Sequence, residues 1–135
     1  MLVTVDAVVF LANSTSPKIL LIKRKNDPFK GCYALPGGFV DMNETLKDAA
    51  TRELFEETGL KGIELNQLAA FDKIDRDPRD RNISIVFYGF TTDNNSTIQG
   101  GDDAEEANWF DLNTLPLLAF DHQDVIQFAL KKITF

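Results

Sequence analysis

The sequence predicts an α/β fold in which helices cover the faces of a mixed β-sheet. Predicted strands come first, then a helix, further strands and a last helix, an order that favours a sheet between helices. Val3 to Leu11 is a continuous apolar run of the kind found in buried strands. Glu44 to Thr58 is the only long helical pattern in the first half. With 135 residues, the chain has the length of one ordinary domain, so 1–135 is expected to be a single domain.

Shorter patterns predict the remaining elements. Apolar stretches bounded by turn residues predict strands at 19–22, 33–35, 65–74, 83–91 and 106–112. Pro36-Gly37-Gly38 is expected to end the strand that begins at Tyr33. Asp121 is a candidate N-cap for the last helix, which carries an apolar stripe.

The long helix has two possible starts. Asp41 lies three residues before Glu44, and Thr45 lies three before Asp48, so both pairs resemble capping boxes. Gly59 is suited to the position just after the helix, where a left-handed backbone is common.

Composition excludes several classes of function. The formal net charge is -7 and the sequence pI is about 4.6, which argues against general nucleic-acid binding. A phosphorylated ligand would therefore need metal ions or a local cluster of Arg and Lys. No apolar run approaches the roughly 20 residues that span a bilayer. The single cysteine, Cys32, fits a reducing compartment, so a cytoplasmic location is expected.

The long helix turns acidic along its apolar stripe. At about 100° per residue, Leu46, Ala50, Glu53 and Glu57 fall on one narrow stripe, and Glu56 lies at its edge. The stripe is apolar for two turns and then becomes carboxylate while still facing the same way. A solvated charged face is the alternative interpretation, but such a face would lie opposite the apolar one.

These glutamates need a counter-charge if they are half-buried. No Lys or Arg follows any of them at four residues, so the helix is expected to offer them no partner. Arg52 precedes Glu56 by four residues, the less favourable order, but it can hold a neighbouring carboxylate by a bidentate bond. Mg²⁺ prefers carboxylate and carbonyl oxygens, and a carbonyl from Pro36-Gly37-Gly38 is a further candidate ligand.

The run GFVDMNETLKDAATRELFEETGL resembles the Nudix box of the Nudix hydrolase superfamily. The residues that fill its nine specified positions are Gly38, Glu44, Arg52, Glu53, Leu54, Glu56, Glu57, Gly59 and Leu60. The resemblance implies an α/β/α sandwich with a central mixed sheet and a loop–helix–loop motif. It also implies hydrolysis of a nucleoside diphosphate that is linked to another group.

The same resemblance implies roles for individual residues. The implied ligands of Mg²⁺ or Mn²⁺ are Glu53, Glu57, Glu56 directly or through water, and the carbonyl of Gly37. Arg52 and Glu44 are implied to orient the glutamates and hold the loop. Metals would neutralise the pyrophosphate and lower the pKa of a bound water, and Glu56 or Glu53 would accept its proton. The alternative bases are Asp102, Asp103, Glu105 and Glu106.

Three further stretches resemble the branch that handles ADP-ribose. They are PFKGCYALPGGFVD, RDPRDRNISIVFYGF and WFDLNTLPLLAFDHQDVI. They imply cleavage of ADP-ribose to AMP and ribose 5-phosphate. The same stretches occur in regulators that sense ADP-ribose and carry a winged-helix domain after it, and no such domain is expected here. The two alternatives are hydrolysis of nucleoside triphosphates and non-catalytic sensing of ADP-ribose.

Residues outside the box are candidates for contacting a nucleotide or nucleotide-sugar substrate. Arg24, Arg79 and Arg81 suit phosphate oxygens, although ordinary surface pairing is an equal alternative. Phe29 is a candidate for stacking on adenine, although a Phe is more often part of the core. His122 is expected to lie at a helix end. A homodimer is possible, with the apolar N-terminal strand in its interface, and neither nucleic acid nor membrane is expected as a partner.

Overall fold

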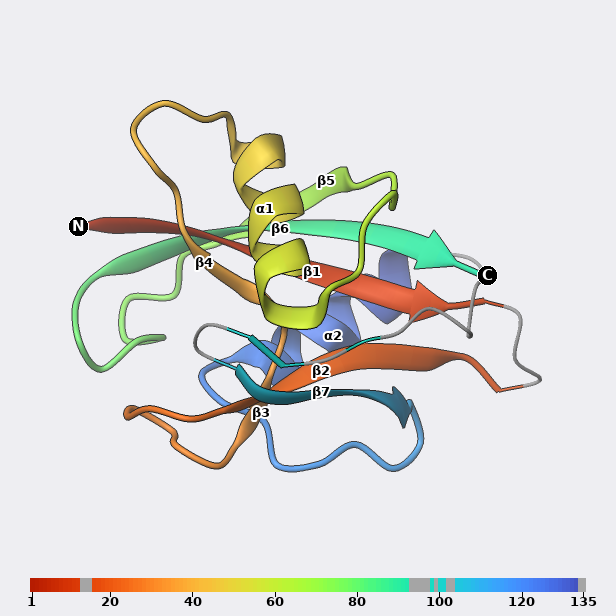
Figure 1. Cartoon of the computed structure of the whole chain (residues 1–135). Coiled ribbons are helices and arrows are strands. Elements are labelled where there is room, and N and C mark those ends of the chain that lie inside the picture. The colour runs from red at the N-terminus through yellow and green to blue at the C-terminus, as the bar shows by residue number, and fades with distance from the viewer. Residues whose placement is uncertain (13–15, 93–97, 99, 102–103, 134–135) are drawn as a thin grey trace.

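The computed structural model describes residues 1–12, 16–92, 98, 100–101 and 104–133 (Figure 1). Its strands are β1 Leu2–Leu11, β2 Lys18–Arg24, β3 Tyr33–Ala34, β4 Gly37–Phe39, β5 Asn66–Phe71, β6 Asn82–Thr91 and β7 Ala104–Asp111. Its helices are α1 Leu46–Thr58 and α2 His122–Lys132. Neither helix in these ranges has the length and hydropathy needed to cross a membrane.

β1 is the central strand of a mixed sheet whose order is β3-β2-β1-β6-β5. It runs parallel to β6 over its whole length, and every other strand pair is antiparallel. On its other side β1 pairs first with β4, from Thr4 to Asp6, and then with β2 at Phe10 and Leu11. β7 extends the sheet beyond β2. The predicted mixed sheet is confirmed.

β4 was not expected, because Pro36-Gly37-Gly38 was interpreted as the end of a strand. Glycine makes this strand possible. A Cβ on Gly37 would lie 2.2 Å from the carbonyl oxygen of Val5, closer than real Cβ atoms approach. The bare backbone can therefore lie directly against β1. This places Gly37 and Gly38 beside the first half of β1, from Thr4 to Asp6.

One helix covers each face of the sheet, as the sandwich prediction requires. Figure 1 shows α1 in front of the sheet and α2 behind it. Ala49, Ala50 and Leu54 of α1 belong to one buried cluster. Val125 and Ile126 of α2 belong to a second. Because the residues of β1 alternate between the two clusters, this strand is buried on both sides.

The burial of β1 accounts for its apolar sequence. Its residues from Val5 to Leu11 are buried within the sheet, whereas Val3 and the preceding Met1 are exposed. The continuous apolar run is explained by two covered faces, and the interface of a homodimer stays a prediction.

The ends of α1 match the sequence in part. Of the two candidate starts, Thr45 is the N-cap, and its hydroxyl accepts the backbone N–H of Asp48 at 3.1 Å. The other pair closes the preceding loop instead, since the Glu44 carboxylate accepts the backbone N–H of Asp41 at 2.8 Å. Gly59 ends the helix in the left-handed conformation, with φ of 76°, as predicted.

Asp121 precedes α2 as predicted, but its side chain makes no capping bond. Its two carboxylate oxygens instead accept Nε and Nη2 of Arg76, at 3.1 and 2.7 Å. The guanidinium satisfies both carboxylate oxygens at once, which a single backbone N–H at a cap would not. This ion pair ties the loop between β5 and β6 to the start of α2.

Candidate active site

Arg52 lies at the centre of the acidic end of α1. Its guanidinium donates to both oxygens of Glu44, with Nη2–Oε1 at 2.6 Å and Nε–Oε2 at 3.0 Å. Nη1 donates to Glu53 at 2.8 Å and to Glu56 at 3.1 Å, and Nη2 also donates to the carbonyl of Phe39 at 3.0 Å. The expectation that the helix offers the glutamates no partner is therefore wrong for Glu53 and Glu56.

These bonds fix the charge of the residues involved. The hydrogen bond from Arg52, reinforced by the backbone N–H of Asp41, lowers the pKa of Glu44 from 4.5 to about 2. The bond to Glu44 in turn raises the pKa of Arg52 above its ordinary value, and the bond to Glu53 adds to this. Arg52 and Glu44 thus form an ionised pair between α1 and the loop before it. We call Arg52 together with Glu44, Glu53 and Glu56 the fork.

Glu44→Gln is expected to change how stability depends on acid. A carboxyl whose folded pKa is depressed stabilises the fold above its unfolded pKa, and this contribution is lost as the pH falls toward the folded value. The stability gap between the parent and the variant should therefore be full above pH 4.5 and shrink toward pH 2. Denaturant unfolding from pH 6 to pH 3 measures it. A gap that stays constant over that range would contradict the role of the fork.

Glu57 continues the buried stripe of α1 and is 3% exposed. Its Oε1 accepts the backbone N–H of Gly37 at 2.8 Å. Gly38 lies against the neighbouring carboxylate, since a Cβ there would be 2.5 Å from Cδ of Glu53. The glycines of β4 thus bring backbone polar groups next to two glutamates of α1.

The residues at this helix end fit a hard divalent cation. Glu53 and Glu57 are carboxylates at the wall of a cleft that Gly37 and Gly38 also line. Across the described ranges, no three His, Cys, Asp or Glu side chains already surround one point. The carboxylates of Glu53 and Glu57 are instead held apart by other partners. Arg52 donates to Glu53, and the N–H of Gly37 donates to Glu57. Cation binding would have to share or replace these bonds.

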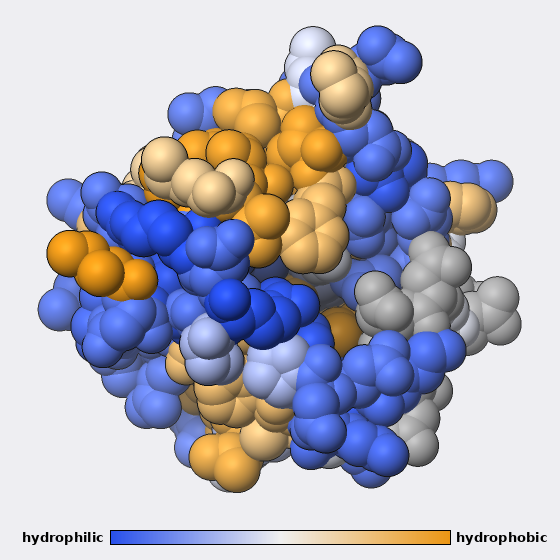
Figure 2. Space-filling view, turned by 90° about the vertical axis from the view of Figure 1, so that its left-hand side faces the viewer, coloured by the Kyte–Doolittle hydropathy of each residue, from blue (hydrophilic) through white to orange (hydrophobic). Residues whose placement is uncertain are grey.

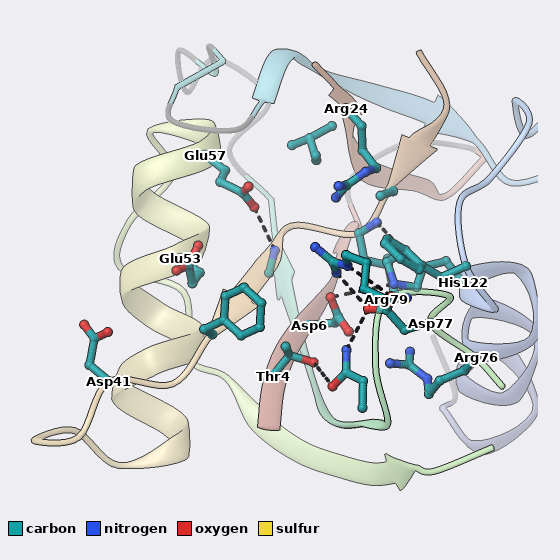
Figure 3. Close-up of a pocket in the computed structure, with 18 residues that line it drawn as sticks. Thr4, Asp6, Arg24, Asp41, Glu53, Glu57, Arg76, Asp77, Arg79 and His122 are labelled. Atoms are coloured by element: carbon teal, nitrogen blue, oxygen red, sulfur yellow. Dashed lines mark hydrogen bonds and ion pairs between the residues drawn. The ribbon is translucent and has the colours of Figure 1, made fainter. Parts of the chain in front are cut away.

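The cleft has a volume of about 300 Å³ and lies between α1 and the start of α2 (Figure 3). Figure 3 shows Glu53 and Glu57 reaching out from α1 on one side, with Arg24 and Arg79 on the other. Thr4 lies between the two sides. The cleft therefore sets carboxylates opposite guanidinium groups, a charge pattern suited to an anionic ligand that arrives with cations.

Phe120 forms the aromatic part of the far wall. The guanidinium carbons of Arg24 and Arg79 lie 5.0 and 5.6 Å from its ring centroid, within cation–π distance. Phe29 packs edge-on against it, with centroids 4.8 Å apart. Both Phe residues have positive φ, 53° at Phe120 and 64° at Phe29. Such backbones are held by their surroundings and are common at functional sites.

Asp77 holds Arg79 in place in the same wall. Its buried carboxylate accepts the backbone N–H and the guanidinium of Arg79, at 2.7 to 3.0 Å, and the amide of Asn82 at 3.3 Å. Burial raises the pKa of Asp77, but the bonds from Arg79 and Asn82 outweigh it and lower the pKa to about 2. Arg79 is therefore directed by a fixed negative charge.

Several predicted site residues lie away from the cleft. Arg81 does not line it, because its Nη1 donates to the carbonyls of Asp72 and Lys73 at 2.7 and 3.3 Å. Phe29 reaches it only through Phe120. The members of the fork other than Glu53 stand behind the cleft wall, and these are Glu44, Arg52 and Glu56.

The late acidic candidates are only partly described. Asp102, Asp103 and the side chain of Glu105 lie outside the described residues. Glu106 is exposed and its Oε1 accepts the hydroxyl of Tyr33 at 2.5 Å and the amide of Asn108 at 3.1 Å. It does not line the cleft.

Sequence reasoning did not single out four groups that line the cleft, namely Asp6, Asp77, Asn82 and Phe120. A carboxylate such as Asp6 within the apolar run of a central strand is itself a signal. Its oxygens face Ser84, which donates a short hydrogen bond, and His122, whose Nε2 is 3.7 Å away. Asn82 and Phe120 lie in stretches that resemble the ADP-ribose branch, but their places in the cleft depend on contacts between segments that are far apart in the sequence.

Comparison with known proteins agrees with this geometry. The NUDIX domain family matches residues 2–129. An ADP-ribose pyrophosphatase of Methanocaldococcus jannaschii is 51% identical over 125 residues, which cover 93% of this chain and 70% of that protein. The ADPR responsive transcriptional repressor NtrR of Acinetobacter baylyi is 36% identical over 98% of this chain. This chain spans 54% of the length of that repressor.

A solved structure shows the same architecture. The NUDIX domain of Shewanella oneidensis NrtR, crystallised with ADP ribose, superposes with a TM-score of 0.90 at 31% identity. The match covers 99% of this chain and 89% of that one. The arrangement of sheet and helices around the cleft is therefore shared with a protein that holds this ligand.

Proposed function

The chain belongs to the NUDIX domain family and is a Nudix hydrolase, and on that premise we propose that it cleaves the pyrophosphate of ADP-ribose to AMP and ribose 5-phosphate. The observation that carries the proposal is the single cleft in which glutamates of α1 face Arg24 and Arg79. The identity to the archaeal ADP-ribose pyrophosphatase supports the choice of substrate.

Nudix hydrolases use divalent cations, and we assign Mg²⁺ or Mn²⁺ to the acidic end of α1. The proposed ligands are Glu53, Glu57, Glu56 directly or through water, and the carbonyl of Gly37. When bound, such cations neutralise pyrophosphate oxygens and make a bound water more acidic. Glu57 is proposed as the deepest ligand, since it is the most buried of the three glutamates.

The fork then has a positioning role in catalysis. Arg52, itself held by Glu44, donates to Glu53 and so holds its carboxylate at the cleft wall. Of the two candidate bases on α1, Glu53 lines the cleft and Glu56 does not, so we favour Glu53 as the group that accepts the proton from water.

The far wall is proposed to bind the rest of the nucleotide. Arg24 and Arg79 supply positive charge to a phosphate, and the ring of Phe120 offers a flat surface to adenine. Phe29 supports that ring from behind, so it acts on the substrate only indirectly.

A second candidate is a module that binds ADP-ribose without turning it over. The similarity to the repressor NtrR over 98% of this chain favours it. The two candidates differ in one measurable way, because a sensor needs the far wall for binding but has no need of the charges on Glu53 and Glu57.

Incubation of the protein with ADP-ribose and Mg²⁺ is expected to yield AMP and ribose 5-phosphate in equal amounts, and chelation of the metal should stop the reaction. Chromatography of the products measures this, with a panel of nucleoside triphosphates as competing substrates and Glu53→Gln as the control variant. Efficient release of pyrophosphate from a triphosphate, with ADP-ribose untouched, would favour the house-cleaning alternative. Tight calorimetric binding of ADP-ribose without product would favour the sensor.

We further propose that residues 1–135 act as one domain in the cytoplasm. The single Cys32 favours a reducing compartment.

We also predict that the protein does not bind nucleic acid and that it forms a homodimer. Light scattering tests the homodimer. Figure 2 shows hydrophobic side chains gathered on one part of the face at the left of Figure 1. Val3 and Phe39, on adjoining strands, are exposed apolar residues of the molecule.

A further inference from the structure

Residues 35–37, which lead from β3 into the first residue of β4, are each held by a different element. The N–H of Leu35 donates to Nδ1 of His122, in α2, at 3.0 Å. The carbonyl of Pro36 accepts a backbone N–H of β1 at 2.8 Å. The N–H of Gly37 donates to Glu57, in α1, at 2.8 Å. The two helices on opposite faces of the sheet therefore meet through one short stretch of backbone.

His122 makes its bond as a neutral acceptor inside the protein. Its side chain is buried, and burial holds the pKa of the imidazole below its ordinary value. Because Nδ1 accepts the N–H of Leu35, the neutral ring carries its proton on Nε2. That nitrogen faces Oδ1 of Asp6 at 3.7 Å, and the other oxygen of Asp6 accepts the hydroxyl of Ser84.

The backbone around His122 is itself anchored, so the ring is a fixed reference point. Asp121, the preceding residue, forms the bidentate pair with Arg76, and both side chains are almost fully buried. The segment before Asp121 also bonds to β3. The N–H of Tyr33 donates to the carbonyl of Leu117 at 3.0 Å, and the N–H of Ala119 donates to the carbonyl of Tyr33 at 2.8 Å.

The backbone between His122 and α1 has little room to shift. Gly37 lies so close to Asp6 that a Cβ on it would be 2.3 Å from Oδ1. The same residue bonds to Glu57 through its N–H. A displacement of Leu35 must therefore be passed on to Gly37 and to the carboxylate that it holds, because the segment cannot relax against β1.

We propose that His122 is a positioning residue for the cation site, acting through the backbone of residues 35–37 on Gly37 and Glu57. The inference rests on the proposed function, which places a divalent cation at those two residues. Nδ1 of His122 fixes the position of Leu35. Leu35 and Pro36 in turn fix the position of Gly37, whose N–H orients the carboxylate of Glu57. The histidine contacts neither cation nor substrate in this role.

The test is Mn²⁺ binding to the substrate-free protein, followed by electron paramagnetic resonance of the free ion. His122→Leu removes the acceptor and is expected to weaken Mn²⁺ binding about 10-fold or more, the usual effect of losing a group that orients a metal ligand. His122→Asn keeps a short-reach acceptor for Leu35 and should restore binding to within about 3-fold. Ile126→Ala is the matched control for lost packing, since Ile126 is buried in the same helix and in the same cluster as Leu35, but its apolar side chain cannot accept the N–H of Leu35.

The outcomes separate the inference from the function on which it rests. Equal Mn²⁺ affinity in folded His122→Leu and the parent would overturn it, as would equal weakening by Ile126→Ala. If His122→Leu does not fold, His122→Gln replaces it, because its oxygen sits one methylene farther out and should also weaken binding relative to Asn. A parent that binds no Mn²⁺ overturns both proposals. A parent that binds Mn²⁺ without hydrolysing ADP-ribose overturns only the function.

Discussion

Glu57→Gln is expected to abolish turnover while leaving the metal-free protein as stable as the parent. The amide oxygen of Gln can still accept the N–H of Gly37, so the bond that now satisfies this buried group survives. The negative charge is lost, and with it the main attraction for a cation. We expect activity to fall about 100- to 1,000-fold, as when one preorganised electrostatic group is removed from an active site.

Thermal unfolding with and without Mg²⁺ measures the second half of this prediction. A ligand at ten times its dissociation constant stabilises the fold by about 1.4 kcal/mol, so the parent should melt roughly 4–6 °C higher with metal. Glu57→Gln should show almost no shift. Glu64→Gln, an exposed glutamate paired with Lys47, is the matched control and should keep both the shift and the activity. Clear destabilisation of metal-free Glu57→Gln would make Glu57 a structural residue.

Arg52→Lys is expected to lower both activity and stability even though the charge is kept. An ammonium group cannot reproduce the planar fork that reaches Glu44, Glu53 and Glu56 at once. The carboxylates left without a donor would repel one another, and Glu53 would no longer be fixed at the cleft wall. We expect kcat to fall about 10- to 100-fold, as for other residues that orient metal ligands.

Steady-state kinetics at saturating Mg²⁺ and a melting curve without metal measure the two effects. Lys47→Met, on an exposed turn of the same helix, removes a cation whose partner Glu64 lies outside the site, and it should leave both values near those of the parent. If Arg52→Lys behaves like Lys47→Met, the fork has no function in catalysis.

Local patterns were enough to predict most of the fold. The buried run of β1, the long helix with its glycine stop and the mixed sheet all depend on periodicity and on turn chemistry, which a sequence carries directly. The acidic stripe of α1 was likewise predictable, since residues 53 and 57 share a face by helix geometry alone. The family assignment from the box is confirmed by the match over residues 2–129.

The missed features all involve partners that are distant in sequence. Asp121 has the residue type of a cap, and only the fold reveals that Arg76 claims its carboxylate instead. β4 could not be predicted because its glycines owe their place to contact with Val5 and Asp6. Phe120 faces the cleft through a left-handed backbone that its own sequence does not favour.

The parallel pairing of the two longest strands has a consequence for how the molecule assembles. Leu2 lies opposite Asn82 and Leu11 opposite Thr91, so the centre of the sheet joins the start of the chain to residues 82–91. Contacts of such wide separation require closure of a large loop before they bring any gain, which slows folding. On the ribosome, β1 must wait for β6 to emerge before its second edge is covered. Until then the most apolar segment of the protein is an open strand edge, the state in which a chain most easily aggregates.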